Sequence, residues 1–293
     1  MGVRQGLRRL GRVEVAMITG RNSGGGRMEA AQLYWDSAAD SYEEVFSGTL
    51  IGKTRRDAVW RELQRLFGAG KSVLEINCGT GLDAVFLAEQ GVELLACDIS
   101  PRMVELARRH AADRGVGDRV EFVALANENL GALGDRSLFD GAFSNFSGLN
   151  CVEDLAGVQM QLAKRLKPGA PLLLCMMGRF ALWEVLWFLL HGRLKRAFQR
   201  VREKTDCVAK SPEVRIHRPS VEEICLQFAP SFRLRQWRGV GIMVPPSYME
   251  HWARRFPGLI NTLARFDQRV GGLPIFRNVA DCVVLEFERV GEI

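Results

Sequence analysis

The sequence lacks several features that would each define a class of protein. No run approaches the ~18 consecutive apolar residues of a membrane-spanning helix. Seven cysteines are scattered along 293 residues without a C-x-x-C pair, which argues against a zinc site. Their odd number, and the lack of the apolar core of a secretory signal, argue against a disulfide framework. We therefore expect reduced cysteines, a cytoplasmic location and no bound metal.

Net positive charge is scarce outside the first 27 residues. The formal net charge is +6, and residues 1–27 contribute +5 of it through six arginines and one glutamate, which leaves +1 for residues 28–293. This leader has too few apolar residues to fold alone and is predicted to be disordered. A targeting segment, a nucleic-acid arm and a start codon upstream of the true domain all remain open for it. The nearly neutral remainder indicates no phosphate-tracking surface, so we expect no nucleic-acid partner.

Residues 72–177 alternate short apolar runs with helical patterns. Such alternation is typical of an α/β fold in which a parallel sheet has helices on both faces. Ligands of these sheets bind beyond the carboxyl ends of the strands. The predicted strands are 72–77, 93–97, 120–125, 140–145, 171–177, 233–241 and 280–287, and the predicted helices are 29–46, 55–67, 82–89, 101–112 and 152–166.

The stretch VLEINCGTGLDA (73–84) carries glycines where the first strand is predicted to end. Gly79 and Gly81 fit both a dinucleotide-binding turn and a site for S-adenosylmethionine. Glu75, inside the strand, is awkward beside a pyrophosphate but suits a ligand with an ammonium group. Asp98, at the end of the second strand, can accept both hydroxyls of a ribose in either ligand. The chain also has no Tyr-x-x-x-Lys pair, which weakens the dehydrogenase interpretation.

Several motifs together resemble a known family. In order and spacing, VLEINCGTG, the aspartate of ACDIS, FDGAFSN (139–145) and LKPGAPLLL (166–174) resemble the class I S-adenosylmethionine-dependent methyltransferases, specifically the small-molecule branch called type 11. The resemblance covers residues 30–178 and the final strand. It implies a Rossmann-like, doubly wound, seven-stranded sheet, mostly parallel with an antiparallel last strand. YWDSAADSYEEVF (34–46) is similar to the N-terminal helix that closes over the cofactor in that branch.

The same resemblance implies which residues contact S-adenosylmethionine. They are Glu75, Gly79 and Gly81 at the methionine moiety, Asp98 at the ribose, Ile99 and Met103 at the adenine, and Asn145 and Phe146 at the floor near the sulfonium.

Two residues depart from the family pattern. Asn77 stands where the family has its first glycine, and Ala126 stands where an aspartate would bind the adenine amino group. Asparagine tolerates unusual backbone angles better than most residues, so the turn can survive. The backbone of Ala126 and Asn127, or the Asn127 amide, would then hold the base. These departures motivate an alternative, a degenerate, non-catalytic protein that binds the cofactor weakly or scaffolds a partner.

Two insertions are predicted beyond a cofactor-binding core of residues 28–178. One is 179–230, after the fifth strand, and the other is 245–270, within the last segment 231–293. RFALWEVLWFLLHGRLKRAFQR (179–200) joins an apolar run of about eleven residues, too short to span a bilayer, to a basic stretch. If the family's sheet order holds, both insertions form a helical cap at the cofactor edge. Its tryptophans would line a substrate pocket, form the cap's own core, or lie on a membrane surface with the basic residues toward lipid phosphates.

The predicted reaction is methyl transfer to a small hydrophobic or amphiphilic acceptor, such as a quinone, polyketide, terpenoid or lipid. Alignment and exclusion of water can supply much of the rate, and a base is needed only if the acceptor must lose a proton. Of the histidines in or beside the cap, His217 is the preferred base, and Tyr42 could close over the cofactor or donate to the substrate. RNA is a weaker acceptor, because the loop after the fourth strand (144–147) lacks the prolines used for base-amino methylation. The oligomeric state stays open.

Overall fold

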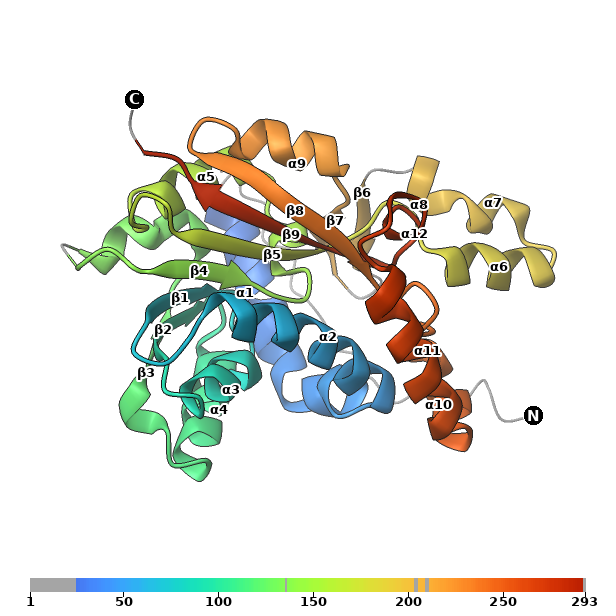
Figure 1. Ribbon diagram of the computed structural model, residues 1–293, viewed down its shortest axis with the longest axis horizontal. Coiled ribbons are helices and arrows are strands. Elements are labelled where there is room, and N and C mark those ends of the chain that lie inside the picture. The colour runs from blue at the N-terminus through green and yellow to red at the C-terminus, as the bar shows by residue number, and fades with distance from the viewer. Residues whose placement is uncertain (1–24, 135, 203–204, 209–210, 292–293) are drawn as a thin grey trace.

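The computed structural model describes residues 25–134, 136–202, 205–208 and 211–291 (Figure 1). The predicted leader lies outside these residues, apart from its last three positions. Those three positions, residues 25–27, begin helix α1 (Gly25–Tyr42), so the prediction of disorder is wrong for them.

The predicted seven-stranded sheet is confirmed. Its strand order is β3-β2-β1-β4-β5-β9-β8, so the order reverses between β1 and β4. Strands β1 to β5 run parallel, and β9 runs antiparallel to both β5 and β8. The bounds are β1 Ser72–Ile76, β2 Glu93–Asp98, β3 Val120–Ala124, β4 Gly141–Ser144, β5 Pro171–Met177, β8 Phe232–Val240 and β9 Cys282–Arg289.

Helices cover both faces of the sheet, as the alternating pattern predicts (Figure 1). One face is buried under α2, α3 and α4, and the other under α5 and α9 with the 3₁₀ segment η3. A parallel sheet needs this double cover because its strands are apolar on both sides. The bounds are α2 Leu50–Leu66, α3 Leu82–Ala88, α4 Pro101–Asp113, η2 Gly117–Arg119, η3 Asn127–Leu133, η4 Gly148–Cys151, α5 Leu155–Ala163 and α9 Val221–Phe228.

Side-chain caps set several helix starts. The Ser100 hydroxyl accepts a hydrogen bond from the Met103 amide, which makes Ser100 the N-cap of α4. Thr49 accepts in the same way from the Gly52 amide, so α2 begins five residues before the predicted start. Capping satisfies backbone N–H groups that the first turn of a helix leaves without partners.

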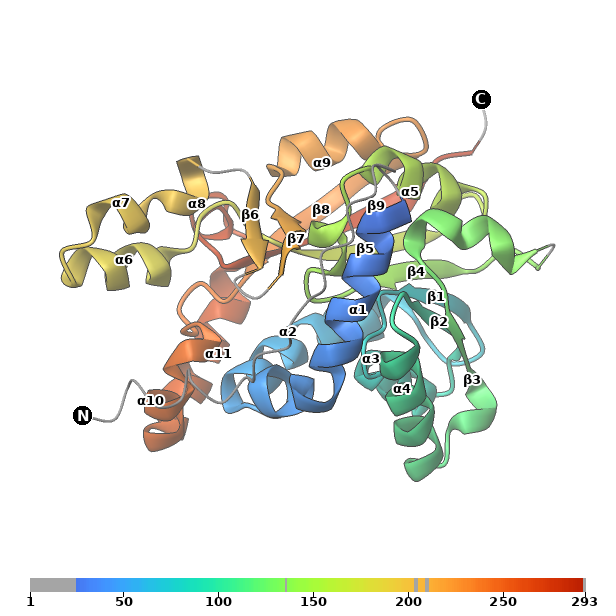
Figure 2. The same cartoon turned by 180° about the vertical axis from the view of Figure 1, so that it is seen from behind.

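Helix α1 and the π-helical turn after it, η1 (Glu43–Ser47), lie outside the sheet layers. Figure 2 shows α1 crossing in front of the sheet, and it contacts both α4 and the strand β7. The Asp36 carboxylate accepts from the Arg102 amide at 3.1 Å and also from the Ser100 hydroxyl, which holds α1 on the first turn of α4.

Both insertions leave from the carboxyl edge of the parallel strands, as the predicted topology requires. Met177, the last residue of β5, and Val240, the last residue of β8, both pair with Cys282. The first insertion contains a two-stranded hairpin, β6–β7, which the expectation of a purely helical cap missed. Its elements are α6 Leu182–Leu190, α7 Leu194–Ala197, α8 Gln199–Arg202, β6 Thr205–Val208 and β7 Ser211–His217. The second contains η5 Ser247–Met249, α10 Glu250–Arg255 and α11 Pro257–Val270, and α12 Pro274–Arg277 lies between it and β9.

Candidate functional site

The glycine loop follows β1 at the point where the strand order reverses. Gly79 and Gly81 both have left-handed backbone angles, φ +53° and +78°. A Cβ on Gly81 would lie 2.6 Å from the Cβ of Ala107, so only glycine lets the loop approach α4 this closely. A Cβ on Gly79 would meet nothing within 4 Å, so space adjoins the loop there. This edge is where α/β sheets bind ligands.

Asp98 ties the end of β2 to the glycine loop. One of its carboxylate oxygens accepts from the Gly79 amide at 2.9 Å and the other from the Ser100 amide at 3.0 Å. Burial raises the pKa of Asp98, and these two hydrogen bonds oppose the rise. The side chain is only 8% exposed. Each oxygen keeps acceptor capacity, so this carboxylate can also receive hydroxyl groups.

Glu75 is a buried carboxylate without a hydrogen bond in the described part of the chain. It is 1% exposed, and neither of its oxygens has a hydrogen-bond partner of ordinary geometry there. Burial raises the pKa of Glu75 well above its usual value and the charge of Asp83 adds to the rise, while the charge of Arg56 and the nearby Ala84 backbone amide oppose it. An unpaired buried carboxylate is costly. Such a group in a ligand-binding edge indicates a cationic ligand.

Sequence reasoning missed a buried network beneath the loop. Asp83 accepts from Arg56 Nη1 at 2.7 Å, from the Trp60 indole at 2.6 Å and from the Asn145 amide at 2.9 Å. The signal was present in α2: Arg56 and Trp60 are four residues apart, and Arg56 falls on the face that Val59 and Leu63 bury.

Asn77, the departure from the family glycine, adopts a left-handed conformation with φ +59°. Its side-chain oxygen accepts from the Asn127 amide at 3.1 Å and from the Ser144 hydroxyl at 3.0 Å. The side chain therefore links the end of β1 to the end of β4 and to the segment after β3. Gly148 leaves room for it, since a Cβ there would lie 2.3 Å from the Cβ of Asn77. The expected survival of the turn agrees with this geometry.

The residues predicted for the adenine lie on adjoining segments beyond β2 and β3. The Leu125 amide donates to the Asp98 carbonyl at 2.8 Å, which places the segment after β3 beside the end of β2. Ala126 and Asn127 are buried on that segment. Ile99 is half-buried, whereas Met103 is 2% exposed. Of the two, Ile99 presents the more accessible apolar surface.

Phe146 lies among aromatic rings and a cation at the end of β4. The Arg56 guanidinium lies 4.6 Å from its ring centroid, and Phe46 meets it edge-on at 5.1 Å. Phe146 and Ser147 both have positive φ, +47° and +69°, which is strained for residues other than glycine. The Phe46 ring in turn lies 6.0 Å from Tyr42.

The structure brings Tyr42 to the same place. Burial raises the pKa of Tyr42; the nearby Arg56 opposes this, and Asp83 and Asp98 add to it. Tyr42 therefore lies within electrostatic range of the glycine loop and the end of β2. Its phenol stays protonated at neutral pH and can donate a hydrogen bond.

His217 ends β7, beyond the carboxyl end of β5. Its carbonyl accepts from the Asn150 amide at 2.6 Å, and the oxygen of the same amide accepts from the Met177 backbone at 2.8 Å. Asn150 thus fixes the His217 backbone at the carboxyl edge of the parallel strands. The other histidines of the insertions, His191 just after α6 and His251 on α10, have exposed side chains.

Comparison with known proteins identifies a domain of the chain. Residues 73–169 match the family model described as "Methyltransferase domain". The chain is 30% identical over 100 residues to a tRNA 5-carboxymethoxyuridine methyltransferase of Escherichia coli K12, covering 33% of this chain and 38% of that protein. It is 31% identical over 144 residues to a demethylmenaquinone methyltransferase of Clavibacter sepedonicus, covering 48% of this chain and 55% of that protein. It is 35% identical over 115 residues to a ubiquinone biosynthesis O-methyltransferase of Xanthomonas axonopodis pv. citri, covering 39% of this chain and 46% of that protein. The matches thus span about half or less of these relatives.

Solved structures show the same fold. The DhpI–S-adenosylhomocysteine complex aligns with a TM-score of 0.55 at 15% identity, over 92% of this chain and all of that one. The [4+2]-cyclase SpnF aligns with a TM-score of 0.52 at 17% identity, over 81% of each chain. At these identities the likeness concerns the fold alone. Residues 73–169 therefore match a methyltransferase domain, and the chain shares the fold of these solved structures, as the resemblance implies.

Proposed function

We propose that this protein transfers a methyl group from S-adenosylmethionine to a small hydrophobic acceptor. The observation that carries the proposal is Glu75, a buried carboxylate with no hydrogen bond in the described residues, next to a glycine loop that Asp98 fixes. A dinucleotide would bring a negative pyrophosphate to this edge, whereas S-adenosylmethionine brings an ammonium group. The two carboxylates, Glu75 and Asp98, therefore fit S-adenosylmethionine.

Each part of the cofactor has a matching group on this edge. Glu75 would pair with the ammonium, and the open side of Gly79 would admit the methionine backbone. Asp98 would accept the ribose hydroxyls, for which each oxygen has spare capacity. The segment of Ala126 and Asn127 would hold the adenine beside Ile99. When bound, the sulfonium supplies an activated methyl group.

The acceptor is expected to be apolar because aromatic side chains would surround the methyl group in the proposed binding mode. Phe146, Phe46 and Tyr42 form a connected series of rings there. Two relatives are named as a demethylmenaquinone methyltransferase and a ubiquinone biosynthesis O-methyltransferase. These names support an amphiphilic ring such as a quinol as the acceptor. Both insertions rise from this edge and would exclude water during transfer.

A hydroxyl acceptor must also lose its proton. We assign His217 as the group that takes this proton, since Asn150 fixes its backbone beyond the end of β5. Tyr42 would donate a hydrogen bond that orients the acceptor, because burial keeps its phenol protonated. Asn145, held by Asp83 at 2.9 Å, would shape the floor.

An RNA acceptor is a second candidate, and the Escherichia coli tRNA methyltransferase relative is the observation that favours it. The charge of residues 28–293, only +1, speaks against it because RNA binding depends on phosphate contacts. A degenerate, non-catalytic protein that binds the cofactor weakly or scaffolds a partner is the third, since Asn77 and Ala126 depart from the family pattern.

The proposal can be tested with two assays. Calorimetric titration should give binding of S-adenosylmethionine and none of NAD. Labelled methyl transfer should then be detected with a demethylated quinol and not with tRNA. Heat with NAD alone, or with neither ligand, would overturn the proposal, and transfer to tRNA alone would select the second candidate.

A further inference from the structure

The first insertion presents apolar side chains to solvent. Leu190 on α6 is 83% exposed and Leu194 on α7 is 64% exposed. Figures 1 and 2 show α6 and α7 side by side, projecting from one end of the molecule. A soluble protein seldom leaves such a surface open. We call it the hairpin surface, after the pair of helices α6 and α7 and not the strands β6 and β7. Its members are Leu186, Leu189, Leu190, Leu194, Phe198 and Val201.

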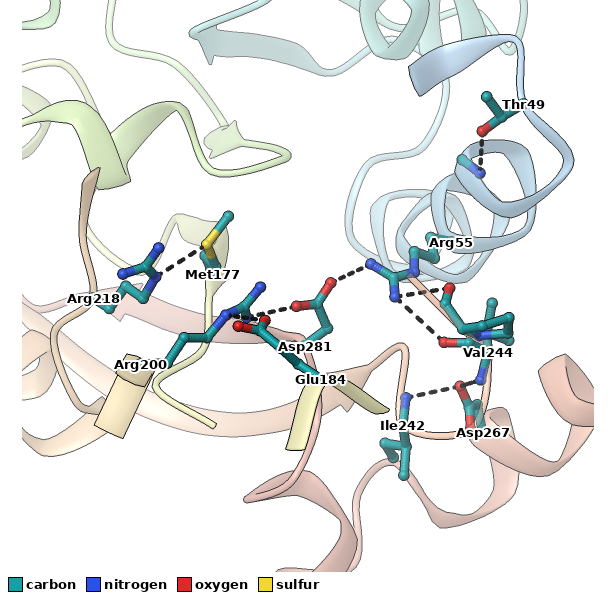
Figure 3. A network of polar contacts seen from close by, with 12 residues as sticks. Thr49, Arg55, Met177, Glu184, Arg200, Arg218, Ile242, Val244, Asp267 and Asp281 are labelled. Atoms are coloured by element: carbon teal, nitrogen blue, oxygen red, sulfur yellow. Dashed lines mark hydrogen bonds and ion pairs between the residues drawn. The ribbon is translucent and has the colours of Figure 1, made fainter. Parts of the chain in front are cut away.

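The inner side of α6 is fixed to the body, so its outer side stays outward. The Trp183 indole donates to the Met243 carbonyl at 2.7 Å, and Val185 is buried. Arg200, on α8, contacts Glu184 at 2.6 Å and Asp281 at 2.7 Å (Figure 3). These contacts anchor the insertion at both of its helical ends.

The charge around the hairpin surface has one sign. Residues 185–202 contain four arginines and one lysine and no aspartate or glutamate. Arg193, Lys195 and Arg196 are exposed in the turn between α6 and α7 and within α7. An apolar helix face flanked by exposed cations is the composition of helices that lie in the headgroup region of anionic membranes.

A second copy of the chain fits this surface less well. In a two-fold dimer the same patch meets itself, so these cations would face each other. No helix in the described part of the chain is long and apolar enough to cross a membrane. The occupant that matches both the apolar side chains and the charge is the surface of an anionic bilayer.

We infer that the hairpin surface docks this protein on anionic lipid bilayers. The inference deepens the proposed function and rests on it for its purpose: a hydrophobic acceptor dissolved in the bilayer would meet the same edge of the sheet that carries the glycine loop. The lipid contact itself depends only on the leucines, Phe198 and the three exposed cations.

Sedimentation with vesicles tests the inference. The full chain should sediment with vesicles of phosphatidylcholine containing about one-third phosphatidylglycerol, at least tenfold more than with phosphatidylcholine alone, and salt should weaken this binding. Leu190→Glu should weaken vesicle binding at least tenfold, because it removes a leucine that the bilayer would bury and adds a negative charge. Lys195→Glu with Arg196→Glu should weaken it about as much.

Matched controls use exposed residues elsewhere. Leu226→Glu, at a leucine on α9 that is 69% exposed, and the pair Lys53→Glu with Lys164→Glu should bind vesicles like the wild type. Circular dichroism and S-adenosylmethionine titration confirm that each variant is folded. Absence of wild-type binding to anionic vesicles, equal binding by Leu190→Glu, or a wild-type dimer that Leu190→Glu dissociates would each overturn the inference. Vesicle binding without S-adenosylmethionine binding would overturn only the proposed function.

Discussion

Two neighbouring arginines on α2 enter networks of opposite character. Arg55 pairs with Asp281 and donates to the carbonyls of Val244 and Pro245, at a place where every carboxylate has partners (Figure 3). Arg56 pairs with Asp83, next to Glu75, whose oxygens have no hydrogen bond in the described residues. The network whose carboxylates all have partners holds the insertions on the core, whereas the one with an unpaired carboxylate leaves capacity for a ligand.

The Arg55 network stabilises the fold, whereas the Arg56 network lies beside the proposed cofactor site. The Arg55 network joins α2 to α6, α8 and the start of β9, and Asp267 accepts three backbone amides beside it (Figure 3). The Arg56 network joins α2 to the first turn of α3, directly after the glycine loop, and to the end of β4. Substitutions on the two sides should therefore separate stability from cofactor binding.

The largest effect is expected from Asp281→Asn. It leaves Arg55 and Arg200 without their shared counter-charge, so the free energy of unfolding at pH 7 should fall by about 3–5 kcal/mol. Urea titration measures this loss. Glu121→Gln, which removes a surface pair with Arg136, is the control and should cost about 0–1 kcal/mol. Equal costs for the two variants would contradict the stabilising assignment.

The same carboxylate gives a pH dependence. Although burial raises it, the Arg55 and Arg200 guanidiniums hold the pKa of Asp281 below its usual value. Its contribution to stability should therefore be complete above the unfolded pKa of about 4 and be lost as the pH falls below it. Asp281→Asn should show a weaker loss of stability between neutral and acidic pH than the wild type.

Asp98→Ala should have the next largest effect, on binding. Removing the acceptor of two ribose hydroxyls should weaken S-adenosylmethionine binding about 100-fold, at about 1.5 kcal/mol for each hydrogen bond to a charged group. Calorimetry measures the affinity, and thermal unfolding checks the fold. Affinity close to that of the wild type would exclude Asp98 from the ribose site.

Tyr42→Phe should lower turnover about tenfold, which corresponds to the loss of one orienting hydrogen bond of about 1.4 kcal/mol. The ring contacts with Phe46 are kept, so stability and S-adenosylmethionine affinity should stay near wild-type values. Steady-state kinetics would show a lower kcat with little change in KM for the cofactor. An unchanged kcat would leave Tyr42 as a packing residue only.

Asn77→Gly should have the smallest effect. Glycine relieves the left-handed strain but loses the hydrogen bonds from Asn127 and Ser144, so the two changes largely offset. S-adenosylmethionine affinity should fall by about threefold at most, because Asn127 loses its anchor. A hundredfold loss would mean that Asn77 itself holds the cofactor.

The sheet was predictable because periodicity and glycine punctuation are local signals. All seven predicted strands of the sheet lie within two residues of their observed bounds. The Arg56–Asp83 network was not predictable from the sequence, because it joins residues 27 apart whose pairing depends on how α2 packs against the loop. The hairpin β6–β7 was missed for a related reason: VRIH is too short for period-two alternation to stand out beside a helical pattern.

The most direct test of the account compares Glu75→Gln with the wild type, first without ligand and then with S-adenosylmethionine. Since the pKa of Glu75 is raised in the folded state, wild-type stability without ligand should fall as the pH rises through that pKa, and the variant should lack this decline. At pH 8 we expect the variant to be more stable by about 1 kcal/mol or more and to bind S-adenosylmethionine at least tenfold more weakly. A variant that is less stable than the wild type, or that binds the cofactor equally well, would contradict the account.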